Sequence, residues 1–237
     1  MEENCDIINF KKSDKYFLVF ASAFVVLLVL TNVIGAKLFA SPYFGFALTT
    51  GIITYPLTFL LTDVMSEIWG AKRTNFVVFL GFFLSLLMLV IVQAAIHLEP
   101  HDYWSGKAFG IEGDERQKAF EFTFYAGYKL LLGSMTAYMI AQLLDVKIYH
   151  YLKRLTKGKH LWLRNNGSTM ISQLFDTFIV NSFLFYWAFG WGFMQGIEVM
   201  GVIYLYKLAI ALIDTPLIYV FVSFTKKQID FKDEAYE

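Results

Sequence analysis

Cysteine, proline and charged residues are scarce in this sequence. It contains one cysteine, four prolines and 17% charged residues in a chain of 237. A single cysteine forms no intrachain disulfide, so a disulfide framework is excluded. Lys plus Arg equals Asp plus Glu at 20 each. Because the basic residues also form no face interleaved with aromatic residues, nucleic-acid binding is disfavoured.

Compact catalytic motifs are also lacking. The sequence contains no P-loop, no GxSxG elbow and no cysteine placed as a nucleophile. Its histidines are scattered among loops and span ends, without metal-ligand spacing, at His97, His101, His150 and His160. We therefore predict that the chain is not an enzyme and binds no metal or cofactor. The alternative is an intramembrane enzyme acting on a lipid or isoprenoid, with a metal held by Asp63 and Glu67.

Apolar residues dominate instead. Hydrophobic residues make up 57% and aromatic residues 19% of the chain, above the apolar share of a soluble domain. Several apolar stretches have the length of about 20 residues that a helix needs to cross a bilayer. We predict one all-α integral membrane domain over residues 1–237, a six-transmembrane-helix bundle with spans at about 17–36, 46–65, 75–97, 122–145, 169–191 and 199–224.

The distribution of cations predicts the orientation of these spans. Most of the 20 Lys and Arg residues lie before the first span, after the second, after the fourth and after the sixth. By the positive-inside rule these segments face the cytoplasm, which places both termini there. The longest outward loop, from His97 to Phe120, has mixed charge. That composition favours a solvated connector, with a lid as the alternative.

The segment from Gly51 to Gly70 combines membrane-spanning length with polar groups. Every fourth residue forms one stripe on a helix, at Tyr55, Phe59, Asp63 and Glu67. Pro56 removes a backbone donor and leaves a carbonyl available to a neighbour or substrate. Charged residues inside a span usually face protein or a water-filled cavity. This face therefore predicts the wall of a polar cavity, although Lys72 and Arg73 could instead neutralise its carboxylates at the membrane interface.

Spans four, five and six carry further polar side chains. They are Gln142, Asp145, Gln173, Asp176, Lys207 and Asp214, with Asn32 and Lys129 as weaker candidates in spans one and four. Amide groups both donate and accept hydrogen bonds, whereas an ionised aspartate only accepts. Together they match a planar heterocycle with mixed edge groups. Hydrogen bonding between helices, or a self-neutralising pair of Lys207 with Asp214, is the structural alternative.

Four motifs resemble those of a known family. They are TYPLTFLLTDVMSEIWGAKR (Thr54 to Arg73), SMTAYMIAQLLDV (Ser134 to Val146), RNNGSTMISQLFDT (Arg164 to Thr177) and YKLAIALIDTPLIY (Tyr206 to Tyr219). In order and spacing they look like the signatures of bacterial queuosine precursor transporters, the vitamin uptake transporter group. This sequence departs from them at Lys129, where we expect arginine, and in its long outward loop.

The resemblance implies both an architecture and a substrate. It implies a multi-pass protein of the bacterial inner membrane, similar to the substrate-binding components of energy-coupling-factor transporters. It also implies import of a 7-deazaguanine such as preQ0, preQ1 or queuine, for salvage into modified tRNA. The polar residues named above, with Tyr55, are then expected to bind the substrate. Energising subunits, the oligomeric state and a membrane scaffold without transport activity remain open.

Overall fold

The structure is a computed structural model that describes residues 11–35, 37–40, 47–105, 115–124, 128–188 and 190–229. Its helices are α1 (Lys12–Ile34), α2 (Tyr55–His97), α3 (Asp102–Ser105), α4 (Glu115–Phe124), α5 (Tyr128–Leu155), α6 (Leu161–Asn181) and α7 (Phe193–Gln228). A 3-10 turn, η1 (Thr50–Ile53), precedes α2, and a π-helical segment, η3 (Ser182–Ala188), follows α6. Two short antiparallel strands, β1 (Leu38–Ala40) and β2 (Ala47–Thr49), pair with Leu38 opposite Thr49.

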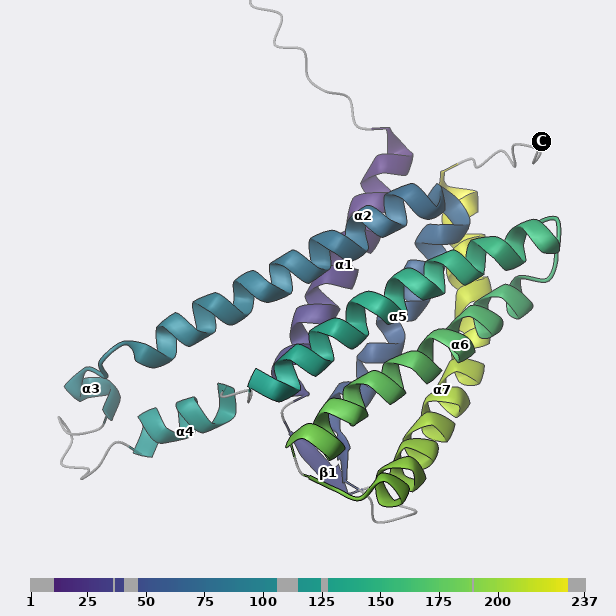
Figure 1. Ribbon diagram of the computed structural model, residues 1–237. Coiled ribbons are helices and arrows are strands. Elements are labelled where there is room, and N and C mark those ends of the chain that lie inside the picture. Colours follow the sequence, from purple (N-terminus) through teal and green to yellow (C-terminus); the bar gives the residue numbers. More distant parts are fainter. Residues whose placement is uncertain are drawn as a thin grey trace, which may run out of the picture.

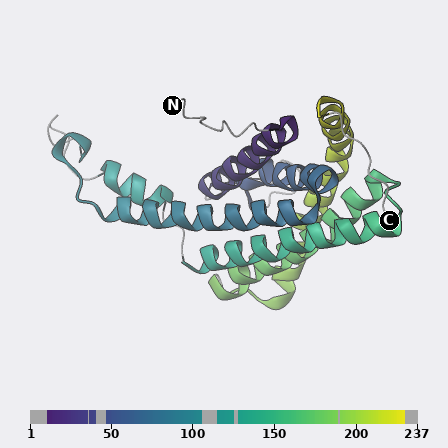
Figure 2. The same cartoon turned by 90° about the horizontal axis from the view of Figure 1, so that it is seen from above.

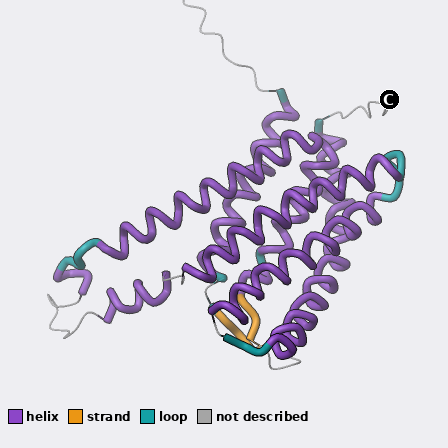
Figure 3. Tube along the Cα trace, viewed as in Figure 1, coloured by secondary structure: helices purple, strands orange, loops and turns teal. Residues whose placement is uncertain are grey.

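The long helices form a bundle whose two ends hold different parts of the chain. Figure 1 shows that the start of α1, the end of α7 and the turn between α5 and α6 lie at one end of it. The strand pair lies at the opposite end, as the tube in Figure 3 shows. At the first of these ends, side-chain contacts join α1 to α2. Arg73 pairs with Asp14 at 3.1 Å, and Trp69 donates a hydrogen bond to Ser13 at 2.9 Å.

Helix α2 is broken at Gly70. It has 43 residues, and Gly70 has φ 81° and ψ 171° in its interior. A straight helix of that length would span about 65 Å, twice the hydrocarbon thickness of about 30 Å. Figure 1 shows the chain rising along the first arm, residues 55–69, and turning back along the second, residues 71–97. The view in Figure 2 shows the second arm extending beyond the other helices, beside α4.

The surface and the interior have the polarity of a membrane protein. Large apolar side chains are exposed along the helices, including Phe76, Phe83, Val90, Leu212 and Ile213. Many polar side chains are buried between the helices instead, a pattern opposite to that of a soluble bundle. Within the described ranges, α1, the segment Thr50–His97 and α7 are long and apolar enough to cross a bilayer. The predicted all-α membrane fold is confirmed at this level.

The helices differ in detail from the predicted spans. Residues 47–53 of the span at 46–65 form β2 and η1 rather than α-helix. Helix α5 continues beyond the expected end of the fourth span, and α6 begins before the expected start of the fifth. The predicted loop contains α3 and the start of α4, and its central part, 106–114, lies outside the described residues. Seven α-helices are described, so the six crossings and the likeness to energy-coupling-factor components stay predictions.

Candidate functional site

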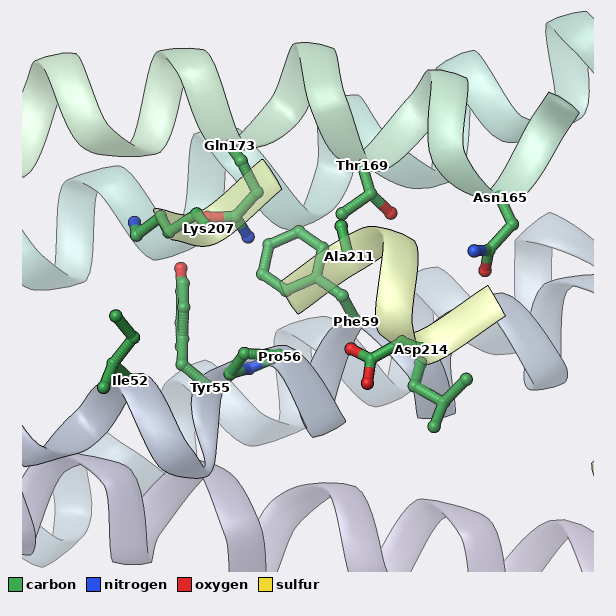
Figure 4. A pocket seen from close by; sticks show the side chains of 11 residues that line it. Ile52, Tyr55, Pro56, Phe59, Asn165, Thr169, Gln173, Lys207, Ala211 and Asp214 are labelled. Atoms are coloured by element: carbon green, nitrogen blue, oxygen red, sulfur yellow. The ribbon is translucent and has the colours of Figure 1, made fainter. Parts of the chain in front are cut away.

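A small cavity lies between the first arm of α2, α6 and α7. Figure 4 shows its lining, which comprises Ile52, Tyr55, Pro56, Phe59, Leu60, Asn165, Thr169, Gln173, Lys207, Ala211 and Asp214. Its volume is about 30 Å³. Since one water needs about 10–15 Å³ on the same measure, this is room for a few waters. Four predicted site residues, Tyr55, Gln173, Lys207 and Asp214, thus meet at one cavity.

Two lining residues, Tyr55 and Lys207, belong to a charged cluster that joins three helices around Asp176, which does not line the cavity itself. The Tyr55 hydroxyl of α2 donates a hydrogen bond to Asp176 Oδ1 of α6 at 2.7 Å. Lys207 of α7 donates to Asp176 Oδ2 and lies 5.4 Å from the centre of the Tyr55 ring. Asp176 is 3% exposed. Its two oxygens therefore receive protein donors that a ligand with N–H groups could replace.

Aromatic and amide groups occupy the rest of the cavity. The rings of Tyr55 and Phe59 pack edge to face, with centres 5.3 Å apart. In Figure 4 the Phe59 ring lies between Gln173 on one side and Asn165 on the other. The amide oxygen of Gln173 is buried and has no hydrogen-bond partner among the residues that the structure describes. A buried acceptor of this kind costs free energy unless a ligand or water satisfies it.

Gln142 and Asp145 lie outside the cavity lining, at the contact of α5 with α2 and α6. Gln142 donates a hydrogen bond to Thr58 and accepts one from Thr62, both at 3.3 Å. Asp145 accepts a hydrogen bond from Ser172 of α6 at 2.9 Å. Asp63, on the same part of α2, lies within hydrogen-bonding reach of Asp145. These three predicted site residues are thus buried beside the cavity rather than in it.

Glu67 lies in a separate ion-pair cluster at the end of the bundle that holds the α5–α6 turn. Its carboxylate lies 2.8 Å from Arg164 of α6, 3.1 Å from Lys153 of α5 and 3.8 Å from Lys226 of α7. The Tyr149 hydroxyl also donates to it at 2.9 Å. Lys72 and Arg73, which the sequence suggested as partners, do not fill this role, and Arg73 pairs with Asp14. One carboxylate thereby joins four helices.

Of the two weaker candidates, Asn32 does not line the cavity. It is half-buried on α1, and its amide nitrogen has no hydrogen-bond partner among the described residues. Lys129 belongs to the first turn of α5, and its side chain lies outside the described part of the structure, so the prediction for it stays a prediction.

Sequence reasoning missed the start of α6. Asn165 and Thr169 line the cavity with Gln173, and their spacing of four residues places them on one face. The fifth span was predicted to begin at 169, which left Asn165 and Arg164 in a loop. The signal that could have found them is the polar stripe itself, extended backwards from Asp176 through Gln173 at helical spacing.

An apolar exterior, buried polar residues and a small cavity between helices define a helical membrane protein. This chain belongs to the family described as "Putative vitamin uptake transporter", whose profile matches residues 49–221. A "Probable queuosine precursor transporter" of Bacillus subtilis is 34% identical over 180 residues, 74% of this chain and 72% of that protein.

Two further relatives carry similar names. The "Queuosine precursor transporter" of Escherichia coli is 25% identical over 86% of each chain. A "Probable queuosine precursor transporter" of Haemophilus influenzae is 28% identical over 60% of this chain and 54% of its own. No solved structure matches this chain.

The family and the helices together place the chain in the bacterial inner membrane as a multi-pass transporter-family protein. Membership of a transporter family agrees with the prediction that the chain is not an enzyme, and the alternative of a lipid-modifying enzyme is not favoured. Among the described residues, no group of three or more His, Cys, Asp or Glu side chains could hold a metal ion.

Proposed function

We propose that this chain imports a 7-deazaguanine queuosine precursor, such as preQ0, preQ1 or queuine, for salvage into modified tRNA. The names of its relatives support the substrate class. We assign the substrate to the cavity because the amide oxygen of Gln173 is buried there without a hydrogen-bond partner among the described residues, beside two aromatic rings. The substrate binds there, between α2, α6 and α7.

The lining groups fit both faces and edges of such a base. A 7-deazaguanine presents ring and exocyclic N–H donors beside a carbonyl acceptor. Gln173 and Asp214 supply acceptors for the donors, and the amide of Asn165 can donate to the carbonyl. Phe59 and Tyr55 offer ring surfaces for stacking. A second carboxylate, Asp176, suits the aminomethyl cation that preQ1 carries.

Binding requires the charged end of the cavity to open. A volume of about 30 Å³ does not hold a bicyclic base. Asp176 is reached by Tyr55 and Lys207, so donors on the ligand would take the place of these two side chains. The exchange keeps the buried carboxylate hydrogen-bonded throughout, which avoids the cost of an unpaired buried charge.

The transmembrane arrangement belongs to the same proposal. The two arms of α2 supply two crossings, and α1, α5, α6 and α7 supply four more, which gives the predicted six. The start of α1 and the end of α7 lie at the same end of the bundle, so both chain ends face one side of the membrane. By the positive-inside rule, that side is the cytoplasm. This count supports an architecture like that of energy-coupling-factor substrate-binding components, with energising subunits or a homo-oligomer as possible partners.

Uptake in bacteria that cannot make the base tests the site. Cells carrying Gln173→Leu should incorporate at least tenfold less queuosine into tRNA from a limiting supply of preQ1, because the buried acceptor is lost. Leu174→Ala is the matched control, since Leu174 is the next residue of α6 and is 50% exposed. Membrane levels of each variant are measured by immunoblot. Normal tRNA modification with Gln173→Leu would remove Gln173 from the site.

Ligand selectivity tests the substrate class directly. A ligand that binds the folded state raises its thermal stability by mass action. The purified protein should be stabilised by preQ0, preQ1 or queuine and not by adenine at the same concentration, because adenine lacks the carbonyl and donor pattern of the guanine edge. Equal stabilisation by adenine, or none by any 7-deazaguanine, would contradict the proposed function.

A further inference from the structure

Two buried carboxyl groups lie beside the cavity and do not line it. Asp63 of α2 is 1% exposed and Asp145 of α5 is 0% exposed. Both oxygens of Asp63 and one of Asp145 receive no hydrogen bond from a donor in the described part of the chain. The two side chains nevertheless face each other within hydrogen-bonding reach. Two ionised carboxylates so close together inside a bilayer would repel each other strongly.

The surrounding charges do not neutralise both groups. The titratable side chains acting on Asp63 are Asp145 from α5, Glu67 from its own helix and Arg164 from α6, and Tyr149 of α5 also faces it. Arg164, the cation among them, lies 2.8 Å from Glu67 and donates to the Gly158 carbonyl. The partners of Asp145 are neutral hydroxyls, of which Ser172 donates at 2.9 Å. A single proton between the two carboxyl groups would join one oxygen of each in a hydrogen bond, and so satisfy two of the three oxygens that lack partners.

We propose that Asp63 and Asp145 form an intramembrane proton-binding site that couples uptake to the proton gradient, an inference that rests on the proposed function. One proton binds between the two carboxyl oxygens from the outer side and leaves to the cytoplasm as the substrate is delivered. No bond other than the O–H bond forms or breaks. A metal cation fits less well, because the protein oxygens that lack partners around the pair are few for its coordination shell.

The link between the pair and the cavity runs through α6 and α2. Thr169 lines the cavity, and its side chain also lies beside Asp145. Phe59 lines the cavity one helical turn before Asp63. A ligand that shifts α6 therefore changes the contacts of Asp145, and the protonation state of the pair in turn affects the packing of α6. Such reciprocal effects on two sites are the requirement for coupling.

Infrared spectroscopy tests the shared proton without any substrate. Purified protein at neutral pH should show the carbonyl stretch of a protonated carboxylic acid, and Asp63→Asn and Asp145→Asn should each remove it. Asp14→Asn is the control that should keep it, because Asp14 is a surface carboxylate paired with Arg73. Circular dichroism checks that each variant is folded. Absence of the band from the wild type, or its persistence in both buried variants, would overturn the proton site.

Vesicle transport tests the coupling. With wild-type protein, a gradient of one pH unit, acidic outside, should raise the equilibrium accumulation of labelled preQ1 about tenfold for one proton per substrate. Asp63→Asn should abolish the response to the gradient. Uptake that ignores pH, or that requires sodium instead, would overturn the coupling and leave the proposed function intact. If none of preQ0, preQ1 and queuine binds, the proposed function fails, and the infrared result still decides on the proton site.

Discussion

At the residue scale, Asp176 does not line the cavity itself but contacts two residues that do. Its carboxylate accepts hydrogen bonds from Tyr55 and Lys207, which belong to two other helices. Lys207 is itself largely buried, with a side chain that is 15% exposed. Both partners of this ion pair are therefore largely buried. If either one were removed, the other would remain as a buried charge without its partner.

Removing the charge of Lys207 alone should destabilise the fold more than removing the charges of both Lys207 and Asp176. Lys207→Met should lower the free energy of unfolding by about 3 kcal/mol, because it leaves a buried carboxylate without its cation. Adding Asp176→Asn to that variant should restore most of the loss, since no uncompensated charge remains. Thermal or denaturant unfolding of the purified protein measures both changes. The control is Lys147→Met, because Lys147 is an exposed cation of α5. Equal stability of the single and double variants would contradict the prediction.

The stripe along the first arm of α2 shows what residue spacing can and cannot predict. Its four residues at four-residue spacing were expected to share one polar wall. The structure divides them among the cavity, the pair with Asp145 and the cluster around Glu67. The reason is geometric, because each step of four residues advances about 40° beyond a full turn. Over three steps the stripe rotates by about 120° and meets different neighbouring helices.

At the scale of elements, the break in α2 depends on one glycine. Gly70 has φ 81° and ψ 171°, a conformation that is essentially restricted to glycine. A Cβ atom there would meet nothing within 4 Å, so the cost of a side chain is conformational rather than steric. The turn between the two arms therefore needs glycine for its backbone alone.

Gly70→Ala should lower the free energy of unfolding by about 1–3 kcal/mol. Gly201→Ala is the matched control, because Gly201 lies in the interior of α7 with ordinary dihedral angles and also has nothing within 4 Å. Alanine is the better helix former, so this change should be neutral or stabilising by up to about 1 kcal/mol. Thermal unfolding in the same detergent compares the two variants. A Gly70 variant as stable as the control would show that the break is not strained.

The sequence predicts helices well where hydropathy alone determines their extent. It predicts them less well where packing against other helices determines where a helix begins or ends. α1 and α7 are apolar over a full membrane thickness, so their existence follows from composition. The ends of α5 and α6 near their shared turn are polar and were expected to be loop. Arg164 and Lys153 are buried there because Glu67 pairs with both. That pairing is tertiary, and no pattern within either segment specifies it.

At the scale of the whole molecule, the orientation in the membrane can be tested with cysteine labelling. Replacing Cys5 by serine removes the one native cysteine. In this background, Lys159→Cys near the α5–α6 turn should react with a membrane-impermeant maleimide only in permeabilised cells, because the predicted orientation places that turn in the cytoplasm. Glu99→Cys, after the end of α2, should react in intact cells. Labelling of Lys159→Cys in intact cells would contradict the predicted orientation.

The break at Gly70 also determines how the cavity could enlarge. Because a single glycine joins the two arms without a loop, a change in its dihedral angles would rotate the first arm about that residue. Tyr55 lies about 22 Å from that pivot, so a rotation of about 5° would move it by about 2 Å. Glu67 sits next to the pivot and would scarcely move. Such a rotation would widen the cavity at Tyr55, whereas the ion pairs of Glu67, close to Gly70, would remain intact.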